Sequence, residues 1–339
     1  MYAKAGEMGL NAIEVPEEYG GIGISKTTYA ALYEEMAKAD AGFFTTMAVT
    51  NLALKPLIIG GRDDLAQKAA DILLGGGYGA FCLTEPMAGS DASNNKTTAV
   101  KDGDEYVLNG RKCFITNGGI ADFYIVTAMT DKSKGVKGMS AFYVEKGTPG
   151  LSAGKEENKM GIRTSNTTDV VFEDMRIPAS ALIGNEGDGF KIAMKTLDMA
   201  RAVMGIGAVG IAQRCIHEAV AYSKQRITFG QPIGKFQAIQ FMIADMEIKT
   251  ETARQMSLHA LKLQEEGLPY GKESAIAKCY AGDIAVEVAL DAIQILGGYG
   301  YSREYPVEKL LRDAKIFQIY EGTNQIQRTV ISRAVMGKF

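Results

Sequence analysis

Apolar residues recur with two different periods along the chain, and the change of period divides it into three segments. Residues 1–78 carry apolar positions at helical spacing, most clearly over 27–38 and 43–59. Residues 79–185 switch to short alternating runs separated by Asp-Gly, Asn-Gly and Lys-Gly pairs, which are typical of β-strands joined by tight turns. From residue 186 the helical spacing returns over longer stretches. The pattern therefore predicts a multidomain α+β protein in the order helical, β, helical.

The β segment is expected to form a barrel or a sandwich. Strands are predicted at 97–100, 105–108, 123–128 and 140–144, and the run 170–172 with the Ile177-Pro178 edge closes the segment. Short, closely spaced strands with a turn signal after each favour these architectures. We assign residues 79–185 to a β-barrel domain, preceded by an N-terminal all-α domain at 1–78.

Four apolar stripes at helical spacing run through the C-terminal segment. Their members are Ala193, Leu197, Met204, Ala208, Ile211, Cys215 and Ala219; Ile239, Met242, Met246, Ala253 and Leu261; Ile276, Tyr280, Ile284, Val288 and Leu296; and Ile326, Val330 and Ala334. Long helices joined by short links that contain Gly or Pro predict a four-helix bundle over 186–339.

Two glycine-rich stretches look like nucleotide-binding loops but lack the required context. Gly205, Gly207 and Gly210 match the dinucleotide fingerprint G-x-G-x-x-G, yet they lie inside a helical stripe instead of between a strand and a helix. We interpret them as positions of close helix packing. The Gly20-Gly21 turn follows no predicted strand and precedes no Lys-Ser or Lys-Thr pair, so we interpret it as a connector. The sequence therefore offers no nicotinamide-type nucleotide site.

Composition narrows the functional class. The 339 residues are 46% hydrophobic and 23% charged with a formal net charge of −3, so there is no basic surplus for nucleic acid. The four cysteines lie far apart without a C-x-x-C pair, which indicates a reducing compartment. With two histidines and no H-E-x-x-H motif, no protein-built metal site is expected. No apolar run reaches the roughly 20 residues of a membrane span.

Five polar segments could carry chemistry, although each alone has an ordinary structural interpretation. Residues 81–91 form a loop with hydroxyl groups and a glycine that allows close backbone approach, and residues 111–119 alone would be a hairpin. Arg226 follows a helix, where it could be a surface or dipole-capping residue. Residues 294–301 are typical of a helix end with capping glycines. Glu321, between an apolar run and a Gly-Thr-Asn turn, alone would be a solvated carboxylate at a helix end.

The order and spacing of these segments resemble the acyl-CoA dehydrogenase family, flavoenzymes that oxidise fatty acyl-CoA thioesters to 2-enoyl-CoA. The run 82–91 is similar to the family's T-E-P-x-A-G-S-D signature, and the run 294–313 is similar to its second signature. Tyr320-Glu321-Gly322-Thr323 resembles the catalytic segment of the short- and medium-chain members. The resemblance covers nearly the whole chain.

The resemblance implies FAD as the cofactor and an oligomer that completes its binding site. The flavin and the start of the acyl-CoA groove would be lined by Phe81, Leu83, Thr84, Gly89, Ser90, Phe114, Ile115 and Thr116. The adenosine and pyrophosphate of a neighbouring subunit's FAD would be bound by Arg226, Thr228, Phe236, Gln237, Gln294, Ile295, Leu296, Gly297 and Gly298, and FAD would also touch Thr323 and Gln325. Contributions from two chains require an oligomer, and the family is usually a homotetramer built as a dimer of dimers.

The resemblance further implies that Glu321 is the catalytic base. The α-proton of a thioester is too weakly acidic for a free carboxylate, so the carbonyl must be polarised and the base desolvated. The Glu321 backbone N–H and a flavin ribityl hydroxyl would polarise the carbonyl. Glu321, its pKa raised by apolar surroundings, would take the α-proton while the β-hydride passes to flavin N5. The substrate would also contact Ser90, Asp198, Arg201, Tyr320 and Gly322.

A variation within the family supports this assignment. Some members place the base immediately before the position of Arg201, where this chain has Ala200. Glu321 is then the remaining base, which points to the straight-chain short- or medium-chain group. The resemblance implies an electron-transferring flavoprotein as the electron acceptor. The expected location is the bacterial cytoplasm, or the mitochondrial matrix for a eukaryotic chain.

The chain departs from the family pattern at three points, and several alternative functions stay open. Met87 stands where Gly is common, and Phe114 stands where many relatives have Trp. Family members usually begin with further helices before the segment at 6–10, so we expect a truncated or late-start form with an exposed apolar patch. An enoyl-CoA reductase, an acyl-CoA oxidase and a catalytically idle scaffold stay possible. A DNA-binding relative would need a basic surface, which disfavours it here.

Overall fold

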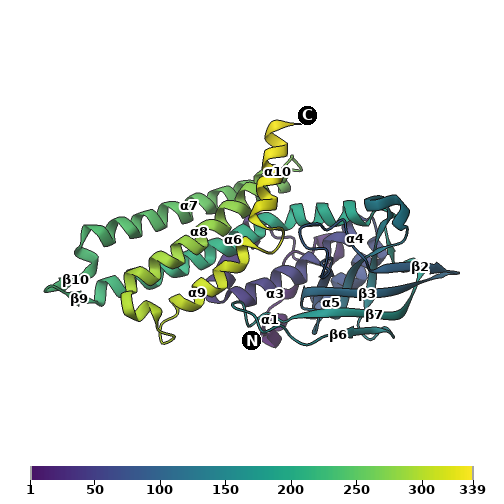
Figure 1. Cartoon of the computed structure of the whole chain (residues 1–339), viewed down its shortest axis with the longest axis horizontal. Coiled ribbons are helices and arrows are strands. Elements are labelled where there is room, and N and C mark those ends of the chain that lie inside the picture. The colour runs from purple at the N-terminus through teal and green to yellow at the C-terminus, as the bar shows by residue number, and fades with distance from the viewer. Residues whose placement is uncertain (1, 338–339) are drawn as a thin grey trace. The chain divides into compact units, whose positions relative to one another are not determined.

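The structure is a computed structural model that describes residues 2–337, and it contains a helical, a β and a second helical segment in the predicted order (Figure 1). Two compact units make up the chain. The first consists of the residues up to 24 together with 46–158 and 165–197, and the second consists of 25–45, 159–164 and the chain from 198 onward. Each unit is described by itself below.

The N-terminal segment is helical, as the period predicts. Its helices are α1 (Tyr2–Glu7), α2 (Lys26–Ala39), α3 (Ala41–Leu52), α4 (Lys55–Ile59) and α5 (Asp63–Leu74). The helix expected at 27–38 is α2, whose N-cap Ser25 accepts a hydrogen bond from the backbone N–H of Thr28. The helix expected at 43–59 is divided into α3 and α4, because Pro56 fits only the first turn of a helix and so starts α4.

All eight strands of the β segment belong to one sheet in the first unit. They are β1 (Gly79–Cys82), β2 (Thr98–Asp102), β3 (Glu105–Thr116), β4 (Phe123–Met129), β5 (Met139–Glu145), β6 (Leu151–Ala153), β7 (Thr167–Pro178) and β8 (Leu182–Ile183). The strand order is β6-β7-β3-β2-β4-β5-β8, and β1 pairs with β4 in parallel. The four strands predicted at 97–144 all form, and the prediction of a β domain is confirmed.

Alternate residues of the central strands enter two separate cores. On β4, Phe123 and Ile125 pack with Leu57 and Leu73 of the helices α4 and α5. The intervening Tyr124 and its neighbours on the same face belong to a second core on the other side of the sheet. Because successive side chains of a strand point to opposite faces, a strand that is apolar at every position is covered on both faces.

The C-terminal segment is built from long helices. They are α6 (Gly189–Gln225), α7 (Gln237–Glu265), α8 (Gly271–Leu296), α9 (Val307–Ala314) and α10 (Asn324–Met336). A small hairpin, β9 (Ile227–Thr228) and β10 (Gln231–Pro232), connects α6 to α7, and α8 packs against both α7 and α10. The first predicted stripe is confirmed, since its members on α6 are buried except for the partly buried Leu197.

The fourth predicted stripe is wrong as a description of the core. In α10 the buried side chains are the polar Asn324 and Gln327, whereas Ile326 and Val330 are only partly buried and Ala334 is exposed. The reason is local, because the start of α10 lies on polar atoms of α8, to which Asn324 is hydrogen bonded.

The glycines that imitate a dinucleotide fingerprint are packing positions, as predicted. Gly205, Gly207 and Gly210 all lie inside α6. A Cβ atom at Gly207 would lie 2.2 Å from the ring of Phe44, and one at Gly210 would lie 2.5 Å from the carbonyl oxygen of Glu34. Only glycine allows these close approaches, so the match to a nucleotide motif arises from helix packing.

Metal-binding groups, cysteines and long apolar helices are each the subject of a prediction. Residues 2–337 contain no group of three or more His, Cys, Asp or Glu side chains that could hold a metal ion, and all four cysteines are free and buried. Two stretches, Ala41–Ile59 and Gly189–Gln225, are long and apolar enough to cross a membrane by length and composition alone. In the apolar 18-residue windows of these two stretches, 89% and 83% are buried, so both have the character of core helices.

Candidate active site

Helix α8 carries the segment that contains Glu321. Asn324 donates hydrogen bonds from Nδ2 to the carbonyl oxygen of Cys279, at 2.9 Å, and to Oδ1 of Asp283, at 2.8 Å. Gln318 donates to the same Asp283 oxygen at 2.8 Å. A Cβ at Gly282 would come within 2.6 Å of the carbonyl oxygen of Phe317, so this helix and the segment touch at their backbones. The segment is therefore fixed at both ends on one face of α8.

The backbone at Glu321 has an unusual conformation. Glu321 has φ 53° and Gly322 has φ 87°, so two successive residues lie in the left-handed region, which a side chain disfavours. Gln327 donates from Nε2 to the carbonyl oxygens of Glu321, at 3.1 Å, and Gly322, at 3.0 Å. A Cβ at Gly322 would lie 2.7 Å from that nitrogen. Strained backbone held by surrounding groups is a common feature of functional sites.

The Glu321 carboxyl group combines burial with a missing partner. The residue is partly buried, but its Oε2 atom is covered and has no hydrogen-bond partner among the described residues. Burial raises the pKa of Glu321 to about 7, although the positive charges of Lys278 and Arg201 oppose the shift. A carboxyl group with a pKa near neutrality can be deprotonated and still accept a proton readily, which is what a general base requires.

Asp198 and Arg201, both predicted to contact the substrate, form an ion pair on α6, one helical turn apart. Arg201 is 4% exposed, and its Nε has no hydrogen-bond partner among the described residues. Burial raises the pKa of Asp198 even though Arg201 acts in the opposite direction. The same carboxylate contributes, after burial, to the raised pKa of Tyr270. The contact of this pair with a CoA moiety stays a prediction.

Replacing the Glu321 carboxyl group by an amide should stabilise the protein, by an amount that grows as the pH rises from about 4.5 to about 7 and is complete at alkaline pH. Glu321 has a folded-state pKa of about 7 against an ordinary value of 4.5, so above pH 7 the folded state holds an ionised group that the unfolded chain solvates better. We expect Glu321→Gln to raise the free energy of unfolding by on the order of 2 kcal/mol at alkaline pH. Thermal unfolding of both proteins at several pH values measures the difference.

The pH dependence provides the control for this stability prediction. Below the ordinary pKa of 4.5 the carboxyl group is protonated in both the folded and the unfolded state, so the advantage of the glutamine variant should disappear there. Glu266→Gln, at an exposed position after α7, should show no such pH dependence. An advantage of Glu321→Gln that is equal at all pH values would contradict the burial of an ionisable carboxyl group.

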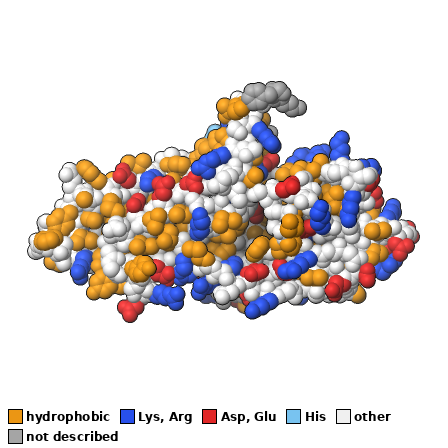
Figure 2. Space-filling model, in the orientation of Figure 1, with side chains coloured by type: hydrophobic (Ala, Val, Ile, Leu, Met, Phe, Trp, Pro, Cys, Tyr) orange, Lys and Arg blue, Asp and Glu red, His pale blue; other side chains and the backbone are white. Residues whose placement is uncertain are grey.

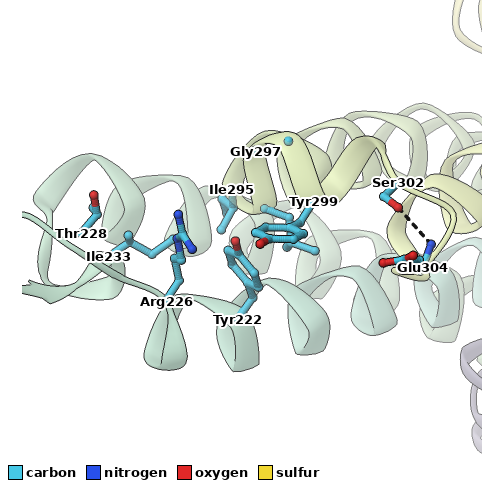
Figure 3. A pocket seen from close by; sticks show the side chains of 11 residues that line it. Tyr222, Arg226, Thr228, Ile233, Ile295, Gly297, Tyr299, Ser302 and Glu304 are labelled. Atoms are coloured by element: carbon cyan, nitrogen blue, oxygen red, sulfur yellow. Dashed lines mark hydrogen bonds between the residues drawn. The ribbon is translucent and has the colours of Figure 1, made fainter.

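A second candidate site lies at the other end of the long helices. A cavity of about 600 Å³ is lined by eleven residues: Tyr222, Arg226, Thr228, Ile233, Ile295, Leu296, Gly297, Gly298, Tyr299, Ser302 and Glu304. Figure 3 shows Arg226 at the end of α6, with its guanidinium group between Thr228 and the ring of Tyr299. The guanidinium carbon lies 5.8 Å from the centre of that ring, a cation–π arrangement.

The lining of this cavity combines a positive charge with open backbone, so it could hold an anionic group such as a phosphate. Arg226 is exposed and belongs to none of the ion pairs formed by the described residues, so its charge is available to an anion. A Cβ at Gly297 or Gly298 would meet nothing within 4 Å, which leaves room for a ligand against the backbone. Gly297 has φ 61° and caps α8, as predicted from the glycines at the helix end.

The structure brings together only part of the residue set predicted for the adenosine and pyrophosphate. Arg226, Thr228 and Ile295 to Gly298 line one cavity, whereas Phe236, Gln237 and Gln294 lie outside its lining. Phe236 instead packs edge to face on Phe229, with ring centres 6.3 Å apart.

The residues predicted to meet the flavin lie in the first unit, where the loop 83–91 is anchored to β3. The backbone N–H of Cys113 donates to the carbonyl oxygen of Thr84 at 2.9 Å. Lys112 and Glu85 form a fully buried ion pair at 2.7 Å, and Lys112 also donates to the carbonyl oxygen of Leu83. The first residues of the loop are therefore fixed to β3 by buried hydrogen bonds and an ion pair. The hairpin considered for 111–119 is the end of β3, followed by a turn at Asn117 with φ 64°.

Exposure separates the predicted flavin residues into two groups. Phe114 is 66% exposed in a left-handed conformation, and Gly89 and Ser90 are exposed as well. Phe81, Thr84 and Thr116 are partly buried. Leu83 and Ile115 are 7% and 2% exposed, so their side chains belong to the interior of the unit and only their backbone could meet a ligand.

The remaining predicted site residues flank Glu321. Tyr320 is partly buried and packs edge to face on Phe317, with ring centres 5.2 Å apart, and burial raises its pKa well above the usual range. Thr323 caps α10 by accepting a hydrogen bond from the backbone N–H of Ile326 at 3.3 Å. Gln325 is exposed on the first turn of that helix.

Sequence reasoning missed two side chains that hold the Glu321 segment. Lys278 lies on α8 between buried residues, is 1% exposed, and donates from Nζ to the carbonyl oxygen of Gly322 at 2.6 Å and to Oδ1 of Asn324 at 2.9 Å. Gln327 is fully buried one turn into α10. A signal existed for Lys278, because a lysine within a run of small apolar residues must find a buried partner or a function.

Comparison with known families places all three segments in one group. Residues 1–76 match the N-terminal domain of acyl-CoA dehydrogenases, residues 80–175 match the middle domain, and residues 187–336 match the C-terminal domain.

Individual relatives are similar over almost the whole chain. The short-chain specific acyl-CoA dehydrogenase of Megasphaera elsdenii is 48% identical, over 97% of this chain and 88% of that protein. The solved structure of butyryl-CoA dehydrogenase from the same organism matches with a TM-score of 0.96 at 48% identity, over 99% of this chain and 89% of that one.

Two further similar proteins carry names other than acyl-CoA dehydrogenase. A chain from a structure reported for the electron transferring flavoprotein of Acidaminococcus fermentans, in connection with flavin-based electron bifurcation, is 51% identical. It has a TM-score of 0.97, over 99% of this chain and 89% of that one. An acryloyl-CoA reductase (NADH) from Anaerotignum propionicum is 46% identical, over 99% of this chain and 86% of that protein.

Proposed function

Because the chain belongs to the acyl-CoA dehydrogenase family, we propose that it is an FAD-dependent enzyme that oxidises short- to medium-chain acyl-CoA thioesters to trans-2-enoyl-CoA, with Glu321 as the base. The observation that carries this proposal is the Glu321 carboxyl group, whose Oε2 is covered and unpartnered and whose pKa is raised to about 7. Similarity to a short-chain specific relative supports the short end of the substrate range.

The residues around Glu321 account for removal of the α-proton. A carboxylate that has lost its water is a stronger base than the same group in solution, and burial provides this at Glu321. Glu321 lies between the helical turn that ends at Gln318 and the start of α10, outside any helix, and its backbone N–H would donate to the thioester carbonyl. The proton removed from the α-carbon would stay on the Glu321 carboxyl group. Ala200, where a rival base could stand, has no titratable side chain.

Two separate groups of residues would hold FAD, and the group around Arg226 would meet the FAD of a neighbouring subunit. Arg226 and the glycines at the end of α8 provide a positive charge and open backbone for the phosphates of a neighbouring subunit's FAD. In the first unit, the anchored loop 83–91 and Phe114 offer exposed groups to a flavin ring. When bound, FAD supplies the two-electron acceptor that the oxidation of a saturated carbon–carbon bond requires. Thr323 and Gln325 stay proposed contacts of the cofactor.

We propose a homotetramer and an electron-transferring flavoprotein as the partners of this chain. Large apolar side chains are exposed on the C-terminal helices and their connections, where hydrophobic atoms gather on the surface (Figure 2). Among them are Phe229 at 91% and Tyr301 at 89% exposure. Apolar surface of this kind supports burial against other copies of the chain. The similarity to a chain from an electron transferring flavoprotein structure supports the second partner.

One relative favours the reverse reaction as a second candidate function. The acryloyl-CoA reductase is almost as similar as the dehydrogenases, so the same site could reduce an enoyl-CoA. Glu321 in its protonated form would then return a proton to the α-carbon, which a pKa near 7 also permits. Oxidation of the reduced protein by crotonyl-CoA without oxygen, compared with its reduction by butyryl-CoA, gives the position of the equilibrium.

The proposed function is tested by mixing the FAD-loaded protein with acyl-CoA substrates in the absence of oxygen. We expect the visible absorbance of the flavin to bleach with butyryl-CoA and to bleach more slowly as the acyl chain lengthens toward dodecanoyl-CoA. Reoxidation in air should be slow, since an oxidase would instead recover its absorbance at once. A protein that takes up FAD but is bleached by no member of the series would contradict the proposal.

A further inference from the structure

The strained segment that carries Glu321 is held by two buried donors. Lys278 Nζ lies 2.6 Å from the carbonyl oxygen of Gly322, and Gln327 Nε2 lies 3.0 Å from the same oxygen and 3.1 Å from that of Glu321. Gln327 leaves its own Oε1 buried without a partner among the described residues, which has a free-energy cost. The two side chains thus fix the carbonyl oxygens of the two left-handed residues, Glu321 and Gly322.

A purely structural role explains the hydrogen bonds of Lys278 but not its charge. The acceptors of its ammonium group are a backbone carbonyl and an amide oxygen, both neutral, and none of the ion pairs of the described residues includes it. Burying a charge without a counter-ion costs several kcal/mol, which a neutral donor at this position would avoid. Burial accordingly lowers the pKa of Lys278 to about 8.

The charges that face Lys278 point to Glu321 as its electrostatic partner. Glu321 acts most strongly on it, followed by Cys279 on the same helix, Arg201 on α6 and Asp283 one turn along α8. Arg201 also acts on Glu321 but is already paired with Asp198, and Asp283 is paired with Arg328. Lys278 is therefore the positive charge near Glu321 that has no ion-pair partner in the described part of the chain.

We propose that Lys278 is a positioning residue for the Glu321 base, which holds the carbonyl oxygen of the following residue and provides the positive charge that stabilises the carboxylate form. The inference rests on the proposed role of Glu321. If Lys278 has this role, one side chain of α8 contributes both to the left-handed turn and to the ionisation of the base. Gln327 shares the first task, because it holds the same carbonyl, but not the second, because it is neutral.

The test separates charge from hydrogen bonding with three variants. Lys278→Gln removes the charge and keeps a donor, Lys278→Arg keeps the charge, and Gln327→Met removes two hydrogen bonds without changing the charge. Each FAD-loaded protein is reduced by butyryl-CoA without oxygen between about pH 6 and about pH 9, and the pH at which the rate rises to half its plateau is measured. Lys262→Met, at an exposed position on α7, is the control.

We expect Lys278→Gln to move the half-rise upward by about one pH unit, which lowers the rate roughly fivefold at pH 7 and about tenfold near pH 6. Lys278→Arg and Gln327→Met should lower the rate while leaving the half-rise near that of the unaltered protein. A loss of rate in Lys278→Gln that is equal at every pH, with the half-rise unmoved, would overturn the proposal. So would an equal displacement in Lys278→Arg.

A second measurement tests the same point without turnover. The carboxyl stretching band of Glu321, identified by its absence in Glu321→Gln, reports its protonation in infrared difference spectra of the FAD-loaded protein. The pKa read from this band should rise in Lys278→Gln and not in Gln327→Met. An unshifted band refutes the role of Lys278, whereas failure of butyryl-CoA to reduce the unaltered protein refutes the proposed function instead.

Discussion

Glu321→Gln is expected to slow the reduction of bound flavin by butyryl-CoA at least about 10³-fold while FAD stays in place. The amide has nearly the shape of the carboxyl group, so the left-handed backbone and its hydrogen bonds to Gln327 should be preserved. What is lost is the only group at this position able to accept the α-proton. Stopped-flow absorbance after anaerobic mixing measures the rate.

Two comparisons make this result specific. Glu266→Gln, which also replaces a carboxyl group but at an exposed position, should reduce its flavin at the normal rate. Glu321→Asp should retain part of the activity, because the base is present but withdrawn by one methylene. If the glutamine variant binds FAD and is bleached at close to the normal rate, another residue removes the proton.

Arg226→Ala is expected to weaken FAD binding by about 10²-fold, the second largest effect. The guanidinium group is the cation in a cavity whose glycines leave backbone open to phosphate, and a neutral side chain would remove that charge. Lys at this position should restore only part of the affinity, since it lacks the planar fork that contacts two phosphate oxygens. Flavin fluorescence during titration of the FAD-free protein measures the dissociation constant.

Lys224→Ala is the matched control for this second prediction. Lys224 is exposed in the last turn of the same helix and does not line the cavity. Its removal should leave FAD affinity nearly unchanged. The dissociation constant for FAD should depend less on salt concentration in Arg226→Ala than in Lys224→Ala. Equal affinities of Arg226→Ala and Lys224→Ala would mean that Arg226 is only a surface residue at the end of α6.

The features that follow from periodicity could be predicted from the sequence. The spacing of apolar residues predicts helix α2, strands β4 and β5, and the buried stripe of α6. The packing role of Gly207 also follows, because its neighbours continue a helix and no strand comes before it. These features depend on residues that are close in the sequence.

The features that depend on contacts between distant residues could not be predicted in this way. Lys278 meets the carbonyl oxygen of Gly322 across 44 positions of the chain, and no local pattern indicates that contact. The left-handed conformation of Glu321 is equally hidden, since a glutamate does not favour it and the surrounding donors impose it. The failed stripe of α10 has the same cause, because tertiary contacts bury Asn324 and Gln327 instead.

The most direct test of the central claim follows the proton and not the flavin. The FAD-loaded protein is incubated with butyryl-CoA in D₂O without oxygen, and deuterium at the α-carbon is measured by mass spectrometry. Glu321 as the base predicts that the unaltered protein incorporates deuterium and that Glu321→Gln, with FAD bound, does not within the same time. Incorporation by the glutamine variant at the rate of the unaltered protein would contradict the account.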